Sequence, residues 1–523
     1  MILAPMLVAA LLATVYLIAD PPSADLAAQT FRAELYSEQG FSVWSNAWYA
    51  GHHLPGYSFL FPPLAAWLDP RLVGAIAAVA SAGLFGALAY HRFGSRARLG
   101  VMWFAAATVT ILLTGRLTFA LGVAVGLAAL LALQRRRVKL AGVLAVLTPF
   151  ASPVAGLFLA IAGLGAAIGR RGRRAARAAG LVAAGALAGI GALVVAFPVE
   201  GVEPFVLSAF QNVPVFAALA LLLIPSEERE LRWGVALYGL AAILLFAFDN
   251  AVGGNATRLG ALFGGPVLAL VLARRRPLAL ALVALPLLWW QVSPAVRDVA
   301  GAVGDPSVER AFHQPLLDEL DSLTVGAPVR IHVPATRNRW EAVHVAPSYP
   351  LARGWLRQAE SDDFELFDDG NLTADAYLDW LHDHAVSYVA VPEGVERDYL
   401  AADEAELIEA GLPFLEEVWS NDDWHLYDVV GEAPMVTSAG GPSLPSTNAR
   451  LAALGPDHFE LTADSPGSYM VRVHHTRYWE VVEGDACVEA EGPWTRVDVQ
   501  VPSVVGVEAI LDVEGLLGRG GGC

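Results

Sequence analysis

The 523-residue chain is poor in cysteine, in lysine and in charged residues generally. Its two cysteines, Cys487 and Cys523, are too few for a disulfide-rich scaffold or for a zinc site built from several thiolates. Lys139 is the only lysine. No glycine-rich phosphate loop follows a predicted strand, and no Gly-x-Ser-x-Gly segment is present. The sequence therefore predicts neither a P-loop nor a serine-hydrolase elbow.

Hydrophobic residues are abundant and concentrated in the first half of the chain. They make up 55% of all residues, and the mean hydropathy is +0.48. Residues 1–294 contain 21 basic and 11 acidic side chains, a net charge of +10, whereas the remainder contains 13 and 41, a net charge of −28. This division predicts an integral membrane domain followed by an acidic soluble part. The acidic part argues against a nucleic-acid partner, which needs clustered cations.

Long apolar runs predict about 11 membrane spans in an α-helical polytopic domain over residues 1–294. The expected spans lie near 1–19, 70–90, 99–115, 117–134, 140–152, 153–169, 179–197, 205–225, 232–248, 259–273 and 277–293. The first run has no basic residues before it, so we interpret it as a retained span. The short pair at 140–169 contains Pro149 and Pro153, and it predicts a helical hairpin whose tip is buried in protein.

The basic residues predict how the chain is oriented in a cell membrane. Clusters at 92–98, 135–139, 170–177, 229–232 and 274–276 all fall in loops on one side of the predicted bundle. The positive-inside rule then places the N-terminus in the cytoplasm. The first loop, residues 20–69, and everything after about residue 294 would lie outside, in the periplasm or the extracellular space.

The soluble part shows two different patterns. Alternating runs at 329–334 and 386–391, with helical runs at 374–385 and 403–410, predict an exterior α/β domain over residues 295–430. Short alternating runs at 469–475, 478–482, 495–501 and 505–513 predict a small β-rich, sandwich-like domain over residues 431–517. The glycine-rich tail, residues 518–523, is expected to be disordered.

The first outer loop, residues 20–69, has an unusual composition for a structural connection. It combines two early acids with aromatic and histidine residues: Asp20, Asp25, Trp44, Trp48, Tyr49, His52, His53 and Tyr57. Its later part reads Trp-x3-Trp-Tyr-x-Gly-x3-Pro-Gly-Tyr. We therefore expect a functional site in this loop.

The early acid, the aromatic run, the many spans and the exterior C-terminal domain together resemble the polyprenyl-phosphate-dependent glycosyltransferases of the GT-C superfamily. The chain is also similar to bacterial membrane proteins labelled as related to 6-pyruvoyl-tetrahydropterin synthase, although nothing in it suggests pterin chemistry. The motif resemblance covers roughly residues 1–65, and the architecture covers about 300 residues. It implies a membrane transferase that moves a sugar from a polyprenyl phosphate to a cell-envelope glycan or glycolipid. The exterior part would bind glycan or orient the acceptor.

The resemblance implies that an acid of the first outer loop is the general base or helps to bind a metal. Asp25 is the matching position, and Asp20 is the alternative. Such chemistry also needs cations for the leaving phosphate and aromatic faces for the sugar. Arg116 and Arg258 are the candidate cations. Trp44, Trp48, Tyr49, His52, His53 and Tyr57 are the candidate substrate contacts.

Simpler interpretations remain for each of these residues. An acid just after a span is commonly a solvated loop residue, tryptophan and tyrosine often form a belt at the membrane interface, and arginine side chains reach for the interface. No metal ligands are predicted, and the need for a divalent metal stays open. The alternative function is non-enzymatic, as a transporter or flippase of lipid-linked glycans or as an envelope assembly partner. The absence of clear repeats and of mid-membrane charges favours the enzyme.

Overall fold

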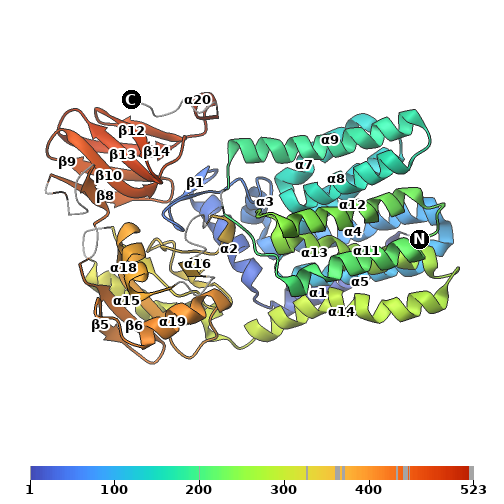
Figure 1. Ribbon diagram of the computed structural model, residues 1–523, viewed down its shortest axis with the longest axis horizontal. Coiled ribbons are helices and arrows are strands. Elements are labelled where there is room, and N and C mark those ends of the chain that lie inside the picture. The colour runs from blue at the N-terminus through green and yellow to red at the C-terminus, as the bar shows by residue number, and fades with distance from the viewer. Residues whose placement is uncertain are drawn as a thin grey trace. The chain divides into compact units, whose positions relative to one another are not determined.

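The computed structural model describes residues 2–199, 201–324, 328–359, 366–367, 372–431, 434–439, 446 and 448–516 (Figure 1). The chain divides into two compact units. Unit 1 contains Met1–Ser37 and Pro55–Val303, and unit 2 contains Glu38–Leu54 and Gly304–Cys523. The tail 518–523, which the sequence predicts to be disordered, lies outside the described residues.

The described part of unit 1 consists of helices and the loops that connect them. Its main helices are α1 (Leu3–Ala19), α2 (Ala24–Gln39), α3 (Phe61–Leu68), α4 (Pro70–Phe93), α5 (Arg98–Leu113), α6 (Leu117–Gln134), α7 (Val138–Ala151), α8 (Pro153–Gly169), α9 (Arg173–Ala196), α10 (Leu207–Phe210), α11 (Asn212–Leu223), α12 (Arg229–Ala247), α13 (Thr257–Leu272) and α14 (Pro277–Ala302). Each apolar run of the sequence is helical. The predicted boundary at residue 294 falls inside α14, and unit 1 ends at Val303.

Six helical stretches of the described chain are long and apolar enough to cross a membrane, or seven if the bent pair α1 and α2 forms one span. The first stretch, Pro70–Leu113, contains both α4 and α5, which pack against each other. Helices α7 and α8 and the run Leu207–Leu223 are shorter. The structure therefore has several helices compatible with a membrane protein, and 11 crossings stay a prediction.

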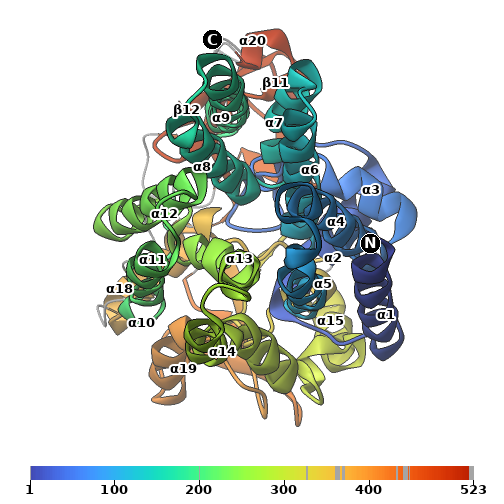
Figure 2. The same cartoon turned by 90° about the vertical axis from the view of Figure 1, so that its right-hand side faces the viewer.

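Small residues bring the helices of unit 1 close together. A side chain at Gly163 of α8 would meet Ala183 of α9, and one at Gly100 of α5 would meet the Pro266 carbonyl of α13. Such close approach is typical of helix packing in membranes. Seen end-on in Figure 2, the helices surround α13. At the turn between α7 and α8, Ser152 is buried and its hydroxyl caps α8.

The arginine clusters gather at one end of unit 1. Arg92 pairs with Glu228 at 2.6 Å and Arg170 pairs with Glu230 at 3.3 Å, so the loops after α4 and α8 meet the loop before α12. Arg275, after α13, pairs with Glu227 at 4.0 Å. We call this the basic end of unit 1.

Unit 2 contains a four-stranded mixed sheet with helices beside it. The strand order is β3 (Arg330–His332), β4 (Val386–Pro392), β6 (Trp424–Val429) and β5 (Leu415–Ser420); β3 and β4 are parallel, and the other pairs are antiparallel. The helices are α15 (Arg310–Leu323), α16 (Glu341–His344), α18 (Ala374–Asp383) and α19 (Ala402–Glu409). Amphipathic α18 buries Tyr377 and Trp380 in the core of this α/β part.

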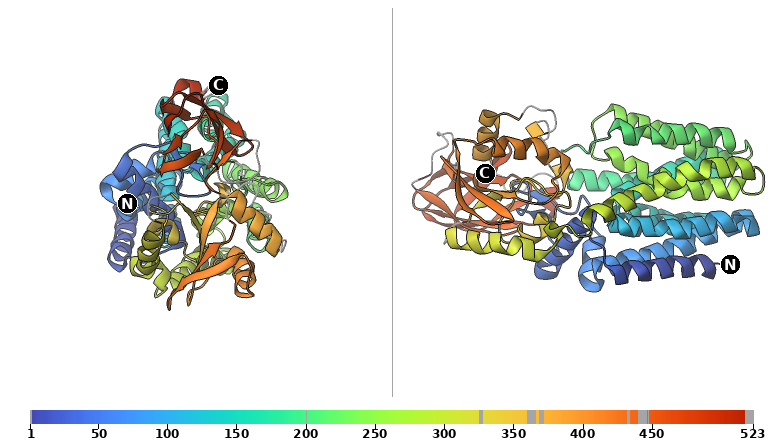
Figure 3. Two further views of the ribbon diagram at one scale, coloured as in Figure 1. Left: turned by 90° about the vertical axis from the view of Figure 1, so that its left-hand side faces the viewer. Right: turned by 90° about the horizontal axis from the view of Figure 1, so that it is seen from below.

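The rest of unit 2 is β-rich and consists of two antiparallel four-stranded sheets (Figure 3). One contains β12 (Ala486–Glu491), β13 (Trp494–Val499), β10 (Gly467–His474) and β7 (Val436–Ser438), and the other contains β11 (Trp479–Glu483), β14 (Ser503–Ala509), β9 (His458–Ala463) and β8 (Ala449–Leu454), in these orders. A short helix, α20 (Val513–Leu516), follows. Cys487, in β12, is disulfide-bonded.

Residues 38–54, which the sequence analysis assigned to the outer loop of the membrane domain, are part of unit 2. They contain a small hairpin of β1 (Trp44–Ser45) and β2 (His52–His53). Trp48 forms a parallel bridge to Leu351, and Leu351 forms one to Ile331 of β3. Two isolated bridges thus connect the segment to the mixed sheet of unit 2.

Candidate active site

Helix α2 positions Asp25 directly after the first apolar helix. Asp20 ends α1 in a left-handed conformation with φ of 46°, and α2 begins at Ala24. Asp25 lies in the first turn of α2, where a carboxylate interacts favourably with the helix dipole. Asp20, the alternative base, pairs instead with Arg71 at 2.8 Å, and its side chain is 70% exposed. Asp25 is therefore the better candidate of the two acids for the role of base.

A tight turn between α5 and α6 brings Arg116 to Asp25. Gly115 has φ of +67°, and a side chain there would collide with the Leu26 amide and the Ser23 hydroxyl. The absence of a side chain lets the turn lie against the first turn of α2. The next residue, Arg116, donates from Nε to Asp25 Oδ2 at 3.1 Å.

The first turn of α13 brings a second guanidinium to the same carboxylate oxygen. Arg258 Nη2 lies 3.7 Å from Asp25 Oδ2, and the Arg258 guanidinium lies 5.8 Å from the centre of the Phe119 ring. Exposed fractions of 21% for Asp25, 29% for Arg116 and 14% for Arg258 show a partly enclosed cluster. Three residues far apart in the sequence thus meet at the ends of three helices.

Tyr57 completes the cluster within unit 1. Gln29 donates to its hydroxyl at 3.2 Å, and the Arg32 guanidinium lies 4.2 Å from the centre of its ring. Burial raises the pKa of Tyr57, the negative charge of Asp25 raises it further, and Arg258 opposes both. Tyr57 is therefore a neutral hydroxyl beside the charged groups.

The cluster has unused hydrogen-bonding capacity. Within the described chain, Arg258 makes no hydrogen bond and Arg116 makes its hydrogen bond through Nε alone. Both contacts go to Oδ2 of Asp25, and its Oδ1 has no hydrogen bond or ion pair there. Two guanidiniums contact this one carboxylate, with Glu203 as a further acid that acts on Arg258, and the arginines retain directed donors. This arrangement suits an anion such as a phosphate ester.

Two members of the cluster, Gln29 and Arg32, are not among the residues that the sequence predicts for the site. Residues 25, 29 and 32 follow the i, i+4, i+7 spacing of one helix face. This helical spacing is present in the sequence, but the polar composition of residues 20–69 predicts a loop, whereas the structure has α2 there. Positively charged and amide side chains on the same face as Asp25 could have been found from that spacing alone.

The other predicted contact residues lie in unit 2 and are largely buried. Trp48 is 0% exposed, stacks on His52 at 5.3 Å between ring centres, and donates to the Ala342 carbonyl at 3.3 Å. Tyr49 donates to the Gly354 carbonyl at 2.7 Å. The remaining members are held in the same way: Trp44 donates to Asn46 at 2.8 Å, and His53 contacts the Thr476 hydroxyl at 3.1 Å. Buried rings cannot stack on a sugar, so these residues stabilise unit 2 in this structure, and only Tyr57 lies beside Asp25.

A second cluster of charged residues, in the α/β part of unit 2, is fully enclosed. His332 Nε2 lies 2.5 Å from Glu404 Oε1, and Tyr377 donates to the same oxygen at 2.8 Å. Burial raises the pKa of Glu404, but His332 and Arg353 outweigh it and hold that pKa below its usual value. All three hydrogen-bonded side chains are inaccessible to solvent, so the cluster acts as a structural polar network.

Comparison with known proteins adds no family. No family model matches the chain, and no curated protein matches it. Among the described residues no group of three or more histidine, cysteine, aspartate or glutamate side chains could hold a metal ion. The cluster of Asp25, Arg116, Arg258 and Tyr57 is therefore the candidate active site.

Proposed function

We propose that the protein is a membrane glycosyltransferase that moves a sugar from a polyprenyl-phosphate donor to a cell-envelope acceptor on the outer face of the membrane. One observation carries the proposal: a carboxylate and two arginines, from α2, the α5–α6 turn and α13, share one partly enclosed place. The carboxylate supplies a base, and the arginines supply an anion site. Transfer of a sugar from a phosphate donor requires both a base for the acceptor hydroxyl and an anion site for the leaving phosphate.

In the proposed reaction the acceptor hydroxyl attacks the anomeric carbon of the donor sugar. The hydroxyl proton passes to the free oxygen of Asp25 as the new carbon–oxygen bond forms. The bond between the anomeric carbon and the phosphate oxygen breaks, and its electron pair stays on the polyprenyl phosphate. Arg116 and Arg258 stabilise this developing negative charge, as charge-assisted donors do in a partly desolvated site. Tyr57 donates a hydrogen bond to the donor phosphate or sugar.

The outward orientation of unit 2 and of the site has two supports. The basic clusters lie at one end of unit 1, and the positive-inside rule assigns this end to the cytoplasm. Helix α1 begins on that side, and Asp25 follows its other end. Cys487 is disulfide-bonded, and disulfides persist mainly outside the cytoplasm. Both features favour an N-terminus inside the cell and a C-terminal part outside.

The test is transfer of labelled sugar from polyprenyl phosphate in membranes that contain the full chain. We expect Asp25→Asn, which keeps the size of the side chain, to lower the rate by roughly 10²–10⁴, the usual loss for a positioned base. The matched control is Asp20→Asn, at an exposed acid only five residues away. Full activity of Asp25→Asn would remove Asp25 from the mechanism. Absence of transfer by the wild type with every common donor sugar would favour the non-enzymatic alternative.

A further inference from the structure

Unit 1 contains a long apolar cavity whose lining includes none of Asp25, Arg116 and Arg258. Its volume is about 360 Å³, and α4, α6, α8, α11, α12 and α13 line it. An apolar cavity of roughly 150 Å³ is already large enough to bind benzene. Most of the lining is Leu, Phe, Val, Ala and Gly, so the occupant of the cavity must be apolar over most of its length.

The cavity is elongated along the helices. On α6 the lining extends from Gly122 to Gln134, and on α13 from Leu259 to Leu270. At 1.5 Å per residue, the α6 stretch alone covers roughly 18 Å, more than half of a hydrocarbon core of about 30 Å. A narrow space of this length fits an alkyl chain better than a compact ligand.

The charged lining residues lie at the basic end. Arg92 and Arg170 both pair with Glu230, at 3.6 and 3.3 Å, and all three residues line the cavity. Gln134 lines the same end; its Nε2 donates to the Leu88 carbonyl at 3.2 Å. Its Oε1 is buried and accepts no hydrogen bond within the described chain. This end therefore carries two ion-paired guanidiniums, of which Arg92 also pairs with Glu228 at 2.6 Å, and one unsatisfied acceptor.

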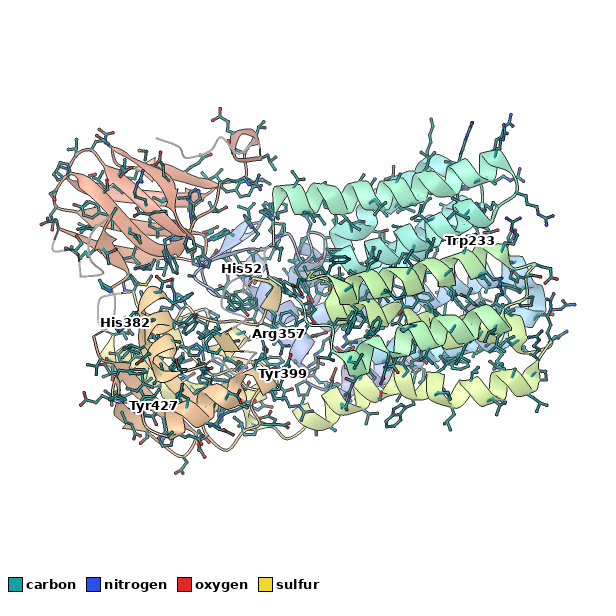
Figure 4. The ribbon with its side chains drawn as sticks, viewed as in Figure 1. His52, Trp233, Arg357, His382, Tyr399 and Tyr427 are labelled. Atoms are coloured by element: carbon teal, nitrogen blue, oxygen red, sulfur yellow. The ribbon has the colours of Figure 1, made fainter. Side chains whose placement is uncertain are left out.

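The excess of basic over acidic side chains at this end of the cavity favours an anionic occupant. The loops of the basic end carry the five basic clusters, and the acids among the described residues of these loops are Glu227, Glu228 and Glu230. Trp233, on the first turns of α12 and 43% exposed, lies near this end (Figure 4) and marks the level at which an indole meets lipid headgroups. Basic pockets between membrane helices on this side bind anionic headgroups.

We propose that this cavity is a binding site for an anionic phospholipid of the inner leaflet. One acyl chain fills the apolar length, the phosphate contacts Arg92 and Arg170, and a headgroup hydroxyl donates to Gln134 Oε1. Phosphatidylglycerol has both the charge and the hydroxyl that this end requires. The inference is independent of sugar transfer, because it uses no residue of the Asp25 cluster.

Native mass spectrometry of the detergent-solubilised full chain tests the site, with phosphatidylglycerol and phosphatidylcholine as the two probes. We expect retention of phosphatidylglycerol and little retention of phosphatidylcholine. Arg92→Gln with Arg170→Gln should weaken binding of phosphatidylglycerol tenfold or more, at about 1 kcal/mol for each basic residue. Arg275→Gln is the matched control, because it removes a charge from the same end without lining the cavity.

A second pair of variants tests the apolar length without touching a charge. Gly234 lines the cavity and has open space where a side chain would begin, so Gly234→Leu should fill it and abolish retention. Gly191→Leu, at an exposed position of α9 with equally open space, should leave retention unchanged. The proposal would be overturned if Arg275→Gln lost as much binding of phosphatidylglycerol as the variant of Arg92 and Arg170, or if Gly234→Leu still retained the lipid. It would also be overturned if only variants of Arg116 and Arg258 lost binding.

Discussion

At the scale of single residues, removal of Arg258 tests the proposed anion site directly. It makes no hydrogen bond within the described chain. Its N–H groups can therefore bind the phosphate of the sugar donor without breaking an existing hydrogen bond. We expect Arg258→Gln to weaken binding of polyprenyl phosphate roughly tenfold or more, the loss of one charge-assisted hydrogen bond. The measurement is binding of polyprenyl phosphate to the purified full chain.

Arg71→Gln is the control for Arg258→Gln, since Arg71 pairs with Asp20 and not with Asp25. An equal loss of affinity in both variants would show a general effect of surface charge. The proposed phosphate site requires a loss in Arg258→Gln alone.

Glu341 gives unit 2 a pH dependence of stability. Burial raises the pKa of Glu341 to about 7, although Thr336 donates to both of its oxygens, at 3.2 and 2.7 Å. The unfolded chain releases this proton near pH 4.5, so between about 4.5 and 7 only the folded state holds it. Stability from this group is therefore complete below pH 4.5 and is lost as pH rises through 7, by on the order of 3 kcal/mol.

Glu341→Gln should remove this dependence, because an amide does not titrate. We expect the stability of α16 in the variant, relative to the wild type, to increase from pH 5 to pH 8, measured by amide exchange in the full chain. Glu406→Gln, at an exposed position of α19, should show no such difference. A constant offset at both pH values would contradict the assigned pKa.

Some site residues could be inferred from the sequence because a charged side chain next to an apolar run is recognisable without knowledge of how the chain packs. Asp25, Arg116 and Arg258 stand out as charges at the ends of apolar runs, and the structure brings all three together. Gln29 and Arg32 did not stand out, because their role depends on α2 being a helix. The sequence also gave no means of knowing that Trp48 is buried, since a tryptophan in a polar segment is equally suited to a surface.

At the scale of elements, the segment 38–54 shows why local patterns cannot assign every loop. Its partners are distant in sequence: Trp48 bridges Leu351, and Asn46 donates to the Gly455 carbonyl at 2.9 Å. No periodicity within 17 residues encodes such pairings. Most helices of unit 1, in contrast, follow long apolar runs, so their bounds could be predicted closely, whereas the polar α2 could not be found in this way.

The burial of Trp48 predicts that unit 2 depends on this segment. Trp48→Ala removes a fully buried indole that lies against Gly354, and we expect it to cost about 3–5 kcal/mol. Amide exchange of β3 in the full chain should accelerate, because Leu351 links Trp48 to that strand. Phe41→Ala, at an exposed position of the same segment, should have a much smaller effect. Unchanged exchange in Trp48→Ala would mean that unit 2 holds its sheet without the segment.

At the scale of the whole molecule, the distribution of charge predicts the orientation of the chain in a membrane. The clusters at the basic end of unit 1 resist translocation, whereas acidic unit 2 contains a disulfide-bonded cysteine. In a full chain carrying Cys487→Ser and Cys523→Ser, an impermeant thiol reagent should modify Ser420→Cys, at an exposed position of β5, in intact cells. It should modify Gly172→Cys, at the basic end, only after the membrane is permeabilised. The reverse pattern would place Asp25 and its arginines on the cytoplasmic side, where an acceptor of the outer envelope does not reach them, and the proposed transfer would lose its substrate.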